Sequence, residues 1–123
     1  MSQELIITHG DAKYVYNKLD CLFSGFIKEL LETNLEGPCE VAISEEREFS
    51  KEIFDLLIEL AKLNSDTVWE RIAALPSRQL FKAIIMANYL DCRELVGDMA
   101  CTIARNIEKK SSKEMKAYFY SEN

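Results

Sequence analysis

The segment 76–90 constrains the fold more than any other part of the chain, because its pattern predicts a helix with almost no polar face. Pro76 suits the first turn of such a helix, since its missing N–H would have no partner within the helix there. The apolar residues of the segment are Leu80, Phe81, Ala83, Ile84, Ile85, Met86, Ala87, Tyr89 and Leu90. A helix that is apolar all round must be covered on most sides. We therefore expect it to be the central core helix or a helix whose outer side meets a partner.

Short β-type runs precede this helix. Residues 4–8 and 14–16 flank turn-forming residues at 9–12, which predicts a β-hairpin. Gly37-Pro38 marks a turn, and residues 39–43 then alternate apolar with polar or small residues. The first half of the chain is therefore expected to contain a small sheet of about three strands.

Helical patterns fill most of the remaining chain. Asp20 can cap a helix with apolar positions over residues 22–31, and Ser50 precedes a strong helical pattern that runs to Asn64. A short helix is expected over residues 68–74. This order of elements predicts an α+β domain in which helices dominate the C-terminal half.

Two further helices are expected after the apolar one, which Asp91 is expected to end. Residues 95–107 carry a clean apolar stripe, and Ser111 with Glu114 has the spacing of a capping box that opens a last short helix. A chain of 123 residues without a long linker is expected to form a single domain, residues 1–123.

The charge of the chain argues against a nucleic-acid partner. There are 21 acidic and 15 basic residues, for a net charge of −6, whereas nucleic-acid binders usually show a basic face. No apolar run approaches the roughly 18 residues of a membrane span, and the N-terminus lacks the pattern of a signal peptide. We expect no membrane association and a reduced intracellular environment.

No pattern in the sequence indicates catalysis, a cofactor or a metal. His9 is the only histidine, and none of the four cysteines has the spacing of a metal knuckle. The four glycines are isolated, so no phosphate-binding loop is expected. The run Glu45, Glu46 and Glu48 is interpreted as a solvated charge cluster. We expect a non-enzymatic protein.

The segment from Val68 onward resembles a known family. Val68-Trp69, then residues 80–91 with Ala87-Asn88-Tyr89-Leu90-Asp91, are similar to the S-phase-kinase-associated (Skp) adaptor of SCF ubiquitin ligases. Residues 94–107 and 111–119 resemble the two helices that follow in that family. The first half fits the family less specifically, with a pattern shared by BTB/POZ domains. The resemblance implies a BTB/POZ-like core over residues 1–91 and shortened partner-binding helices over 92–123.

In that family the adaptor holds a cullin on one side and an F-box substrate receptor on the other. The resemblance places Asn88 and Tyr89 on the cullin face. It also implies a location in the cytoplasm and nucleus. The F-box face falls on the last two helices of the chain, at positions matching Val96, Ile103, Ile107, Met115 and Phe119.

Two features depart from the family pattern. A long acidic insert usually precedes the helix that begins near Val68, and here only Ser65, Asp66 and Thr67 stand in its place. A flexible insert can be lost at small cost. The family's final helices are also absent after Asn123, so we expect a reduced F-box face.

Alternatives remain open at this point. Asn88 and Tyr89 either find partners inside the chain or face another protein, where tyrosine is a common anchor. The apolar stripe of the last two helices is either core or interface. An elongin-C-like adaptor that grips a receptor helix, and a homodimerising BTB scaffold, fit the same pattern. A homodimer is also possible when no partner is bound.

Overall fold

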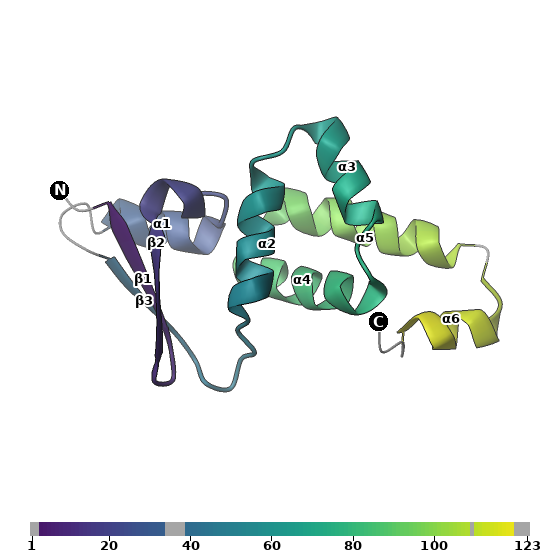
Figure 1. Cartoon of the computed structure of the whole chain (residues 1–123), viewed down its shortest axis with the longest axis horizontal. Coiled ribbons are helices and arrows are strands. Elements are labelled where there is room, and N and C mark those ends of the chain that lie inside the picture. The colour runs from purple at the N-terminus through teal and green to yellow at the C-terminus, as the bar shows by residue number, and fades with distance from the viewer. Residues whose placement is uncertain (1–2, 34–38, 109, 120–123) are drawn as a thin grey trace.

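The chain folds with a small sheet at one end and a group of helices at the other (Figure 1). The computed structural model describes residues 3–33, 39–108 and 110–119. The predicted turn at Gly37-Pro38 lies outside the described residues. The α+β class, the three-stranded sheet and the helix-rich C-terminal half are confirmed.

The sheet consists of β1 (Glu4–His9), β2 (Ala12–Asn17) and β3 (Cys39–Ile43) in the order β2-β1-β3. β1 pairs antiparallel with β2, which confirms the predicted hairpin, and parallel with β3. Gly10 occupies the hairpin turn with a φ of 61°, a conformation that favours glycine. Alternation along the strands buries one face of the sheet, with Leu5, Ile7, Cys39, Val41 and Ile43 in the core.

A 3-10 helix, η1 (Lys18–Cys21), and helix α1 (Gly25–Thr33) follow the hairpin. The prediction that Asp20 caps α1 is wrong, because Asp20 lies inside η1. The hydroxyl of Ser24 caps α1 instead, accepting a hydrogen bond from the N–H of Ile27 at 3.1 Å. Ser24 is buried, so this cap is part of the core.

Two helices begin at side-chain caps, of which the sequence analysis predicted the first. Ser50 caps α2 (Lys51–Ala61) by accepting from the N–H of Ile53. Asn64 caps α3 (Ser65–Ala73) by accepting from the N–H of Thr67 at 2.9 Å. The expectation that α2 runs to Asn64 is therefore wrong, since Asn64 starts the next helix. α3 consequently begins three residues before the predicted position.

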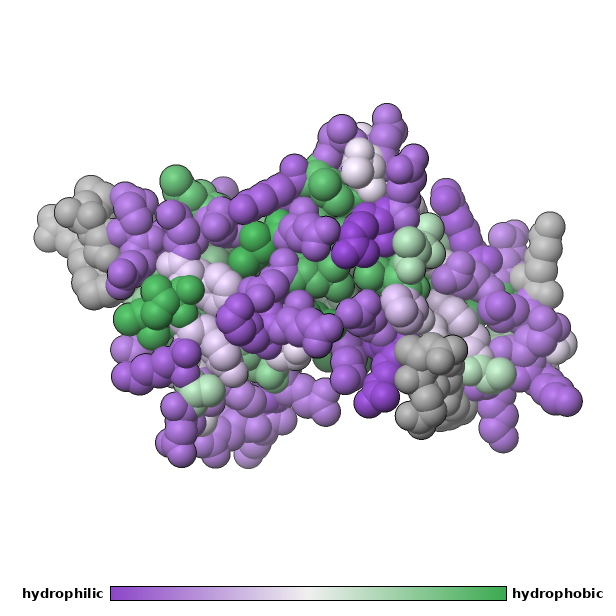
Figure 2. Space-filling model, viewed as in Figure 1, coloured by the Kyte–Doolittle hydropathy of each residue, from purple (hydrophilic) through white to green (hydrophobic). Residues whose placement is uncertain are grey.

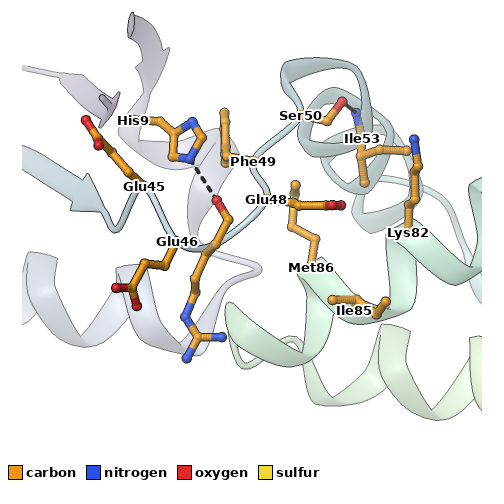
Figure 3. A pocket seen from close by; sticks show the side chains of 11 residues that line it. His9, Glu45, Glu46, Glu48, Phe49, Ser50, Ile53, Lys82, Ile85 and Met86 are labelled. Carbon is orange, nitrogen blue, oxygen red and sulfur yellow. Dashed lines mark hydrogen bonds between the residues drawn. The ribbon is translucent and has the colours of Figure 1, made fainter. Parts of the chain in front are cut away.

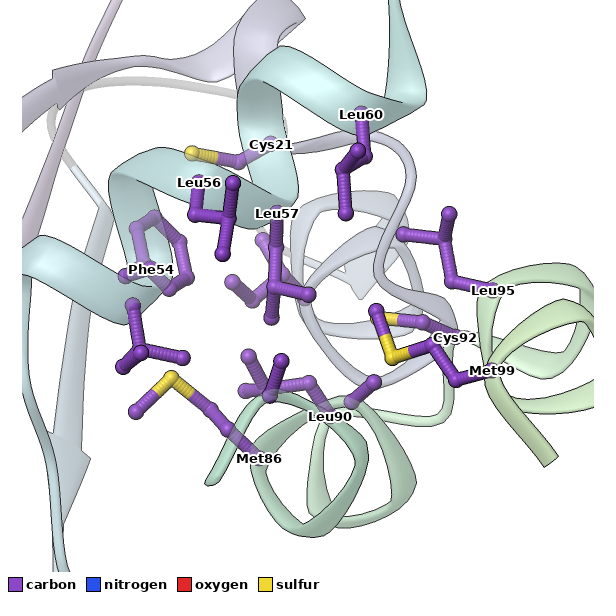
Figure 4. Packing of buried hydrophobic residues seen from close by; sticks show 14 of the residues in the cluster. Cys21, Phe54, Leu56, Leu57, Leu60, Met86, Leu90, Cys92, Leu95 and Met99 are labelled. Carbon is purple, nitrogen blue, oxygen red and sulfur yellow. The ribbon is translucent and has the colours of Figure 1, made fainter. Parts of the chain in front are cut away.

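Helix α4 (Ser77–Tyr89) is the apolar helix of the sequence, and it contacts both α2 and α5 (Arg93–Ile107). Leu80, Ala83, Met86 and Ala87 are buried on its inner sides. Together with α2 and α5 it forms the centre of the core, in which Phe54, Leu57, Leu90 and Met99 are fully enclosed (Figure 4). One narrow stripe of α4 remains open, because Lys82, Ile85 and Asn88 are exposed.

The C-terminal end of α4 is joined to the N-terminal end of α1. The carbonyl oxygen of Leu90 accepts hydrogen bonds from the Ser24 hydroxyl at 2.6 Å and from the Phe26 N–H at 3.2 Å. The carbonyl oxygen of Asp91, a residue with a φ of 57°, accepts from the Gly25 N–H at 3.0 Å. Carbonyl groups at the end of α4 thus accept hydrogen bonds from N–H groups at the start of α1, which have no partner within their own helix.

Helix α6 (Ser112–Phe119) lies at the far end of the molecule from the sheet (Figure 1). The predicted capping box is confirmed: the Glu114 N–H donates to the Ser111 hydroxyl, and the Ser111 N–H donates to the Glu114 carboxylate. α6 has no buried residue and touches α4. It is the most peripheral helix among the described residues.

Candidate protein-interaction site

The stretch 87–91 divides between core and surface. Ala87 and Leu90 are fully buried, and the backbone of Asp91 holds α1. Asn88 is exposed and Tyr89 is half-buried. Asn88 and Tyr89, the two predicted cullin-face residues, therefore present their side chains outward, as does Asp91, whose carboxylate pairs with Arg93 at 3.2 Å.

Tyr89 already has partners within the chain. Its ring centroid lies 5.8 Å from that of Phe26, and the guanidinium carbon of Arg47 lies 4.3 Å from the centroid of its ring. A cation over an aromatic ring is attracted by the negative face of the ring. These contacts orient the ring beside the loop before α2 and leave part of it accessible.

A groove runs along the open stripe of α4, and we call it the α4 groove. One wall is α4 itself; the other is the loop 44–50 together with the start of α2. It consists of three hollows of about 330, 450 and 250 Å³ that share lining residues. Tyr89 lines one end of the groove and Pro76 the other, so the groove follows nearly the whole helix.

The loop wall of the α4 groove is fixed by contacts to the sheet. The Nε2–H of His9 donates a hydrogen bond to the carbonyl oxygen of Arg47 at 2.8 Å (Figure 3). The ring of Phe49 lies against the rings of Tyr14 and Phe54, with centroid distances of 5.3 and 5.6 Å. The only histidine of the chain thus has a structural role here, and the groove has two ordered walls.

Ile85 is the most exposed apolar side chain of α4, with 69% of its surface accessible. It lies between the two walls with Met86 (Figure 3). Ile85 precedes Asn88 by three residues and Tyr89 by four, so the three side chains share one helix face. That spacing could have identified Ile85 from the sequence. No pattern in the sequence indicated that Glu46, Arg47 and Glu48, in a distant loop, would form the opposite wall of the groove.

The second predicted surface spans α5 and α6. Val96, Ile103 and Ile107 are half-buried along α5, and Val96 and Ile103 pack against the core. Val96 also lines a hollow of about 250 Å³ with Asn88, next to the start of α5. This brings one predicted F-box residue beside one predicted cullin residue.

The other two residues of that predicted surface are on α6. Met115 is half-buried, and Phe119 is 45% exposed although its ring stacks on Phe81 of α4 at 5.4 Å. Tyr118 also meets Phe81, at 5.3 Å, and its hydroxyl accepts a hydrogen bond from the Asn106 amide. The aromatic end of α6 is therefore partly occupied inside the chain.

Outside the α4 groove, the described residues give little indication of reactive or metal-binding side chains. Burial, with a smaller effect of Asp20 and Asp91 respectively, raises the pKa of the Cys21 and Cys92 thiols to about 12, so both are neutral near pH 7. Within residues 3–33, 39–108 and 110–119, no three His, Cys, Asp or Glu side chains are grouped to hold a metal ion. None of the described helices is both long and apolar enough to cross a bilayer.

The visible face in Figure 2 is mainly polar, with apolar side chains gathered in its middle among α2, α3 and α4.

No protein-family model matches the chain, and no curated protein matches it either.

Proposed function

We propose that this chain is a non-enzymatic, BTB/POZ-like adaptor that bridges a cullin scaffold and an F-box substrate receptor in an SCF-type ubiquitin ligase. In this proposal Asn88 and Tyr89 contact the N-terminal domain of the cullin. Val96, Ile103, Ile107, Met115 and Phe119 form the F-box side. Adaptors of this kind work in the cytoplasm and nucleus, and we propose the same location here.

The observation that carries the proposal is the open stripe on α4. A helix whose other apolar side chains are buried or half-buried exposes Ile85, Asn88 and part of Tyr89 beside an ordered groove. Exposed apolar side chains with adjacent aromatic rings are typical of protein interfaces. The F-box side has less support, because the rings of Tyr118 and Phe119 on α6 already pack against Phe81.

The test is capture of purified cullin N-terminal domain by the full chain and by two variants. Ile85→Glu places a charge in the α4 groove, and Leu19→Glu is its matched control on η1, since both side chains are 69% exposed. We expect Ile85→Glu to weaken capture by at least about tenfold, because one central apolar anchor can contribute more than 1 kcal/mol. Leu19→Glu should bind like the parent.

Both variants should melt near the parent temperature, since neither side chain is in the core. Equal binding by all three proteins would refute the assignment of the cullin face. No capture by the parent chain would refute the cullin function itself. A parallel pulldown with an F-box peptide and a receptor-box helix separates the SCF adaptor from an elongin-C-like adaptor.

A homodimerising BTB scaffold is the second candidate, and one specific observation favours it. Three large apolar residues lie exposed close together in the sequence over β2, η1 and the following turn: Val15 at 63%, Leu19 at 69% and Leu22 at 43%. If this segment joins two copies, Leu19→Glu should shift the parent from dimer to monomer in analytical ultracentrifugation. A parent that is monomeric at high concentration would exclude this candidate.

A further inference from the structure

The two walls of the α4 groove carry opposite net charge. On the α4 wall the charged side chains are those of Lys82 and Arg78. On the loop wall they include the carboxylates of Glu46 and Glu48, and the start of α2 adds Glu52. The floor between them is apolar, with Ile53, Ile85 and Met86.

The other two charged side chains of the loop, those of Arg47 and Glu45, also line the groove. The guanidinium of Arg47 lies over the Tyr89 ring at the end of the groove. Glu45 lies toward the hairpin turn, where its Oε1 would be 3.1 Å from a Cβ at Gly10 (Figure 3). Within the described part of the chain, Lys82 forms no ion pair with the loop wall. The ammonium group of Lys82 is therefore available to a bound partner.

The length and shape of the groove fit a helix. It follows α4 from Pro76 to Tyr89, a span of about 20 Å at 1.5 Å per residue. An amphipathic helix laid in an apolar groove is a common mode of recognition, with anchors repeating every three or four residues.

From these observations we propose that the α4 groove binds an amphipathic helix of a partner protein that has acidic residues on one flank of its apolar stripe and basic residues on the other. The acidic flank pairs with Lys82, and the basic flank pairs with Glu46 and Glu48. Because the walls differ in sign, they fix the direction in which the partner helix lies. Ile85 contacts its apolar stripe. This inference deepens the proposed function, since it specifies the recognition chemistry of the face assigned to the cullin.

The experiment uses three designed helical peptides of about 18 residues, long enough to be partly helical in isolation. All share a leucine stripe at helical spacing. The first has glutamates on one flank and lysines on the other, the second has glutamates on both flanks, and the third has lysines on both. Binding to the full chain is measured by fluorescence anisotropy at low salt and again at about 0.5 M salt, where screening is strong.

The parent chain should bind the mixed peptide tightest. Lys82→Glu should make the all-lysine peptide the tightest, changing its relative affinity by about twofold to fivefold at low salt, the range expected for exposed charge pairs. Lys13→Glu, an exposed lysine on β2 away from the groove, is the matched control and should leave the ranking unchanged. Ile85→Glu should weaken all three peptides.

A ranking that Lys82→Glu does not change would overturn the proposal, and so would a parent chain that binds none of the peptides or all of them equally. Failure of the proposed function has a different result. If the mixed peptide binds as expected and cullin is not captured, the groove chemistry holds and its partner is another protein.

Discussion

Helices α4 and α6 look alike in composition, each with several apolar or aromatic side chains, and yet they hold very different places in the molecule. α4 has core on most of its sides, and its last carbonyl groups bind α1. α6 has no buried residue and is attached mainly by aromatic contacts with Phe81. The difference shows that the stability of a helix here depends on how many neighbours enclose it, since propensity alone contributes little.

The largest expected effect comes from the end of α4. Leu90→Ala removes a fully buried side chain from the centre of the core, and we expect it to lower the free energy of unfolding by about 3–4 kcal/mol. Chemical denaturation followed by circular dichroism measures this change. A loss below about 1 kcal/mol would mean that α4 is not the central helix of the core.

Two glycine substitutions test the hydrogen-bonded junction between the end of α4 and the start of α1. A Cβ at Gly25 would lie 2.5 Å from Asp91 Oδ2 and 2.9 Å from the Asp91 carbonyl oxygen, so Gly25→Ala should destabilise the fold by about 2–3 kcal/mol. The matched control is Gly97→Ala in α5, where a Cβ meets nothing within 4 Å and should stabilise the helix by up to about 1 kcal/mol. Similar melting temperatures for both variants would argue against this junction between α4 and α1.

A change in the aromatic contacts of α6 should affect that helix and leave the rest of the fold nearly unchanged. Phe119→Ala removes the ring that stacks on Phe81, and we expect a global loss of no more than about 1 kcal/mol. Hydrogen exchange should instead show faster exchange in α6 with little change in α4. If α4 amides lose protection to the same extent, the two helices unfold together and the contrast between them disappears.

The smallest effect concerns the cap of α6 and depends on pH. Hydrogen bonds from the Ser111 backbone N–H, then its side chain, hold the pKa of Glu114 below its ordinary value of 4.5; burial opposes this and Lys110 assists it. Because the folded-state pKa is lowered, the cap stabilises α6 above pH 4.5 and is lost as the pH falls through the lower folded-state value.

Helix-sensitive Cα chemical shifts follow this change across the acidic range. The parent should show fraying of α6 as the pH falls below 4.5, while Glu114→Ala should be frayed at pH 7 and lose that transition. The shifts of α4 should stay constant in both proteins. A parent whose α6 shifts do not change at low pH would show that the capping box contributes nothing to the helix.

Much of the fold was predictable because its determinants are local. The hairpin follows from alternation and from glycine in the turn, and the caps of α2 and α6 lie within three residues of the groups they bind. Asp20 was misassigned as a cap, because the hydroxyl of Ser24 accepts from the N–H of Ile27 instead; the same hydroxyl also donates to the carbonyl oxygen of Leu90, 66 residues away. No local pattern reports such a contact.

The candidate site was predictable in part for the same reason. Asn88 and Tyr89 could be singled out on α4, but the groove beside them exists because the loop 44–50 crosses that helix. The run Glu45, Glu46 and Glu48 was interpreted as a solvated charge cluster, and all three side chains are indeed exposed; that they line the wall of a groove was not predicted. Phe119 was expected on an open surface; it is 45% exposed, and its ring also stacks on Phe81.

The sequence by itself determined the elements of this protein, and above all a central helix too apolar to stand alone. Periodicity and caps act over a few residues, so they are legible in any stretch of chain. Only the tertiary structure decided which stripe of that helix stays open, what lies across from it and where α6 rests. Those outcomes depend on which faces of distant elements meet, and the order of residues along one segment does not encode that.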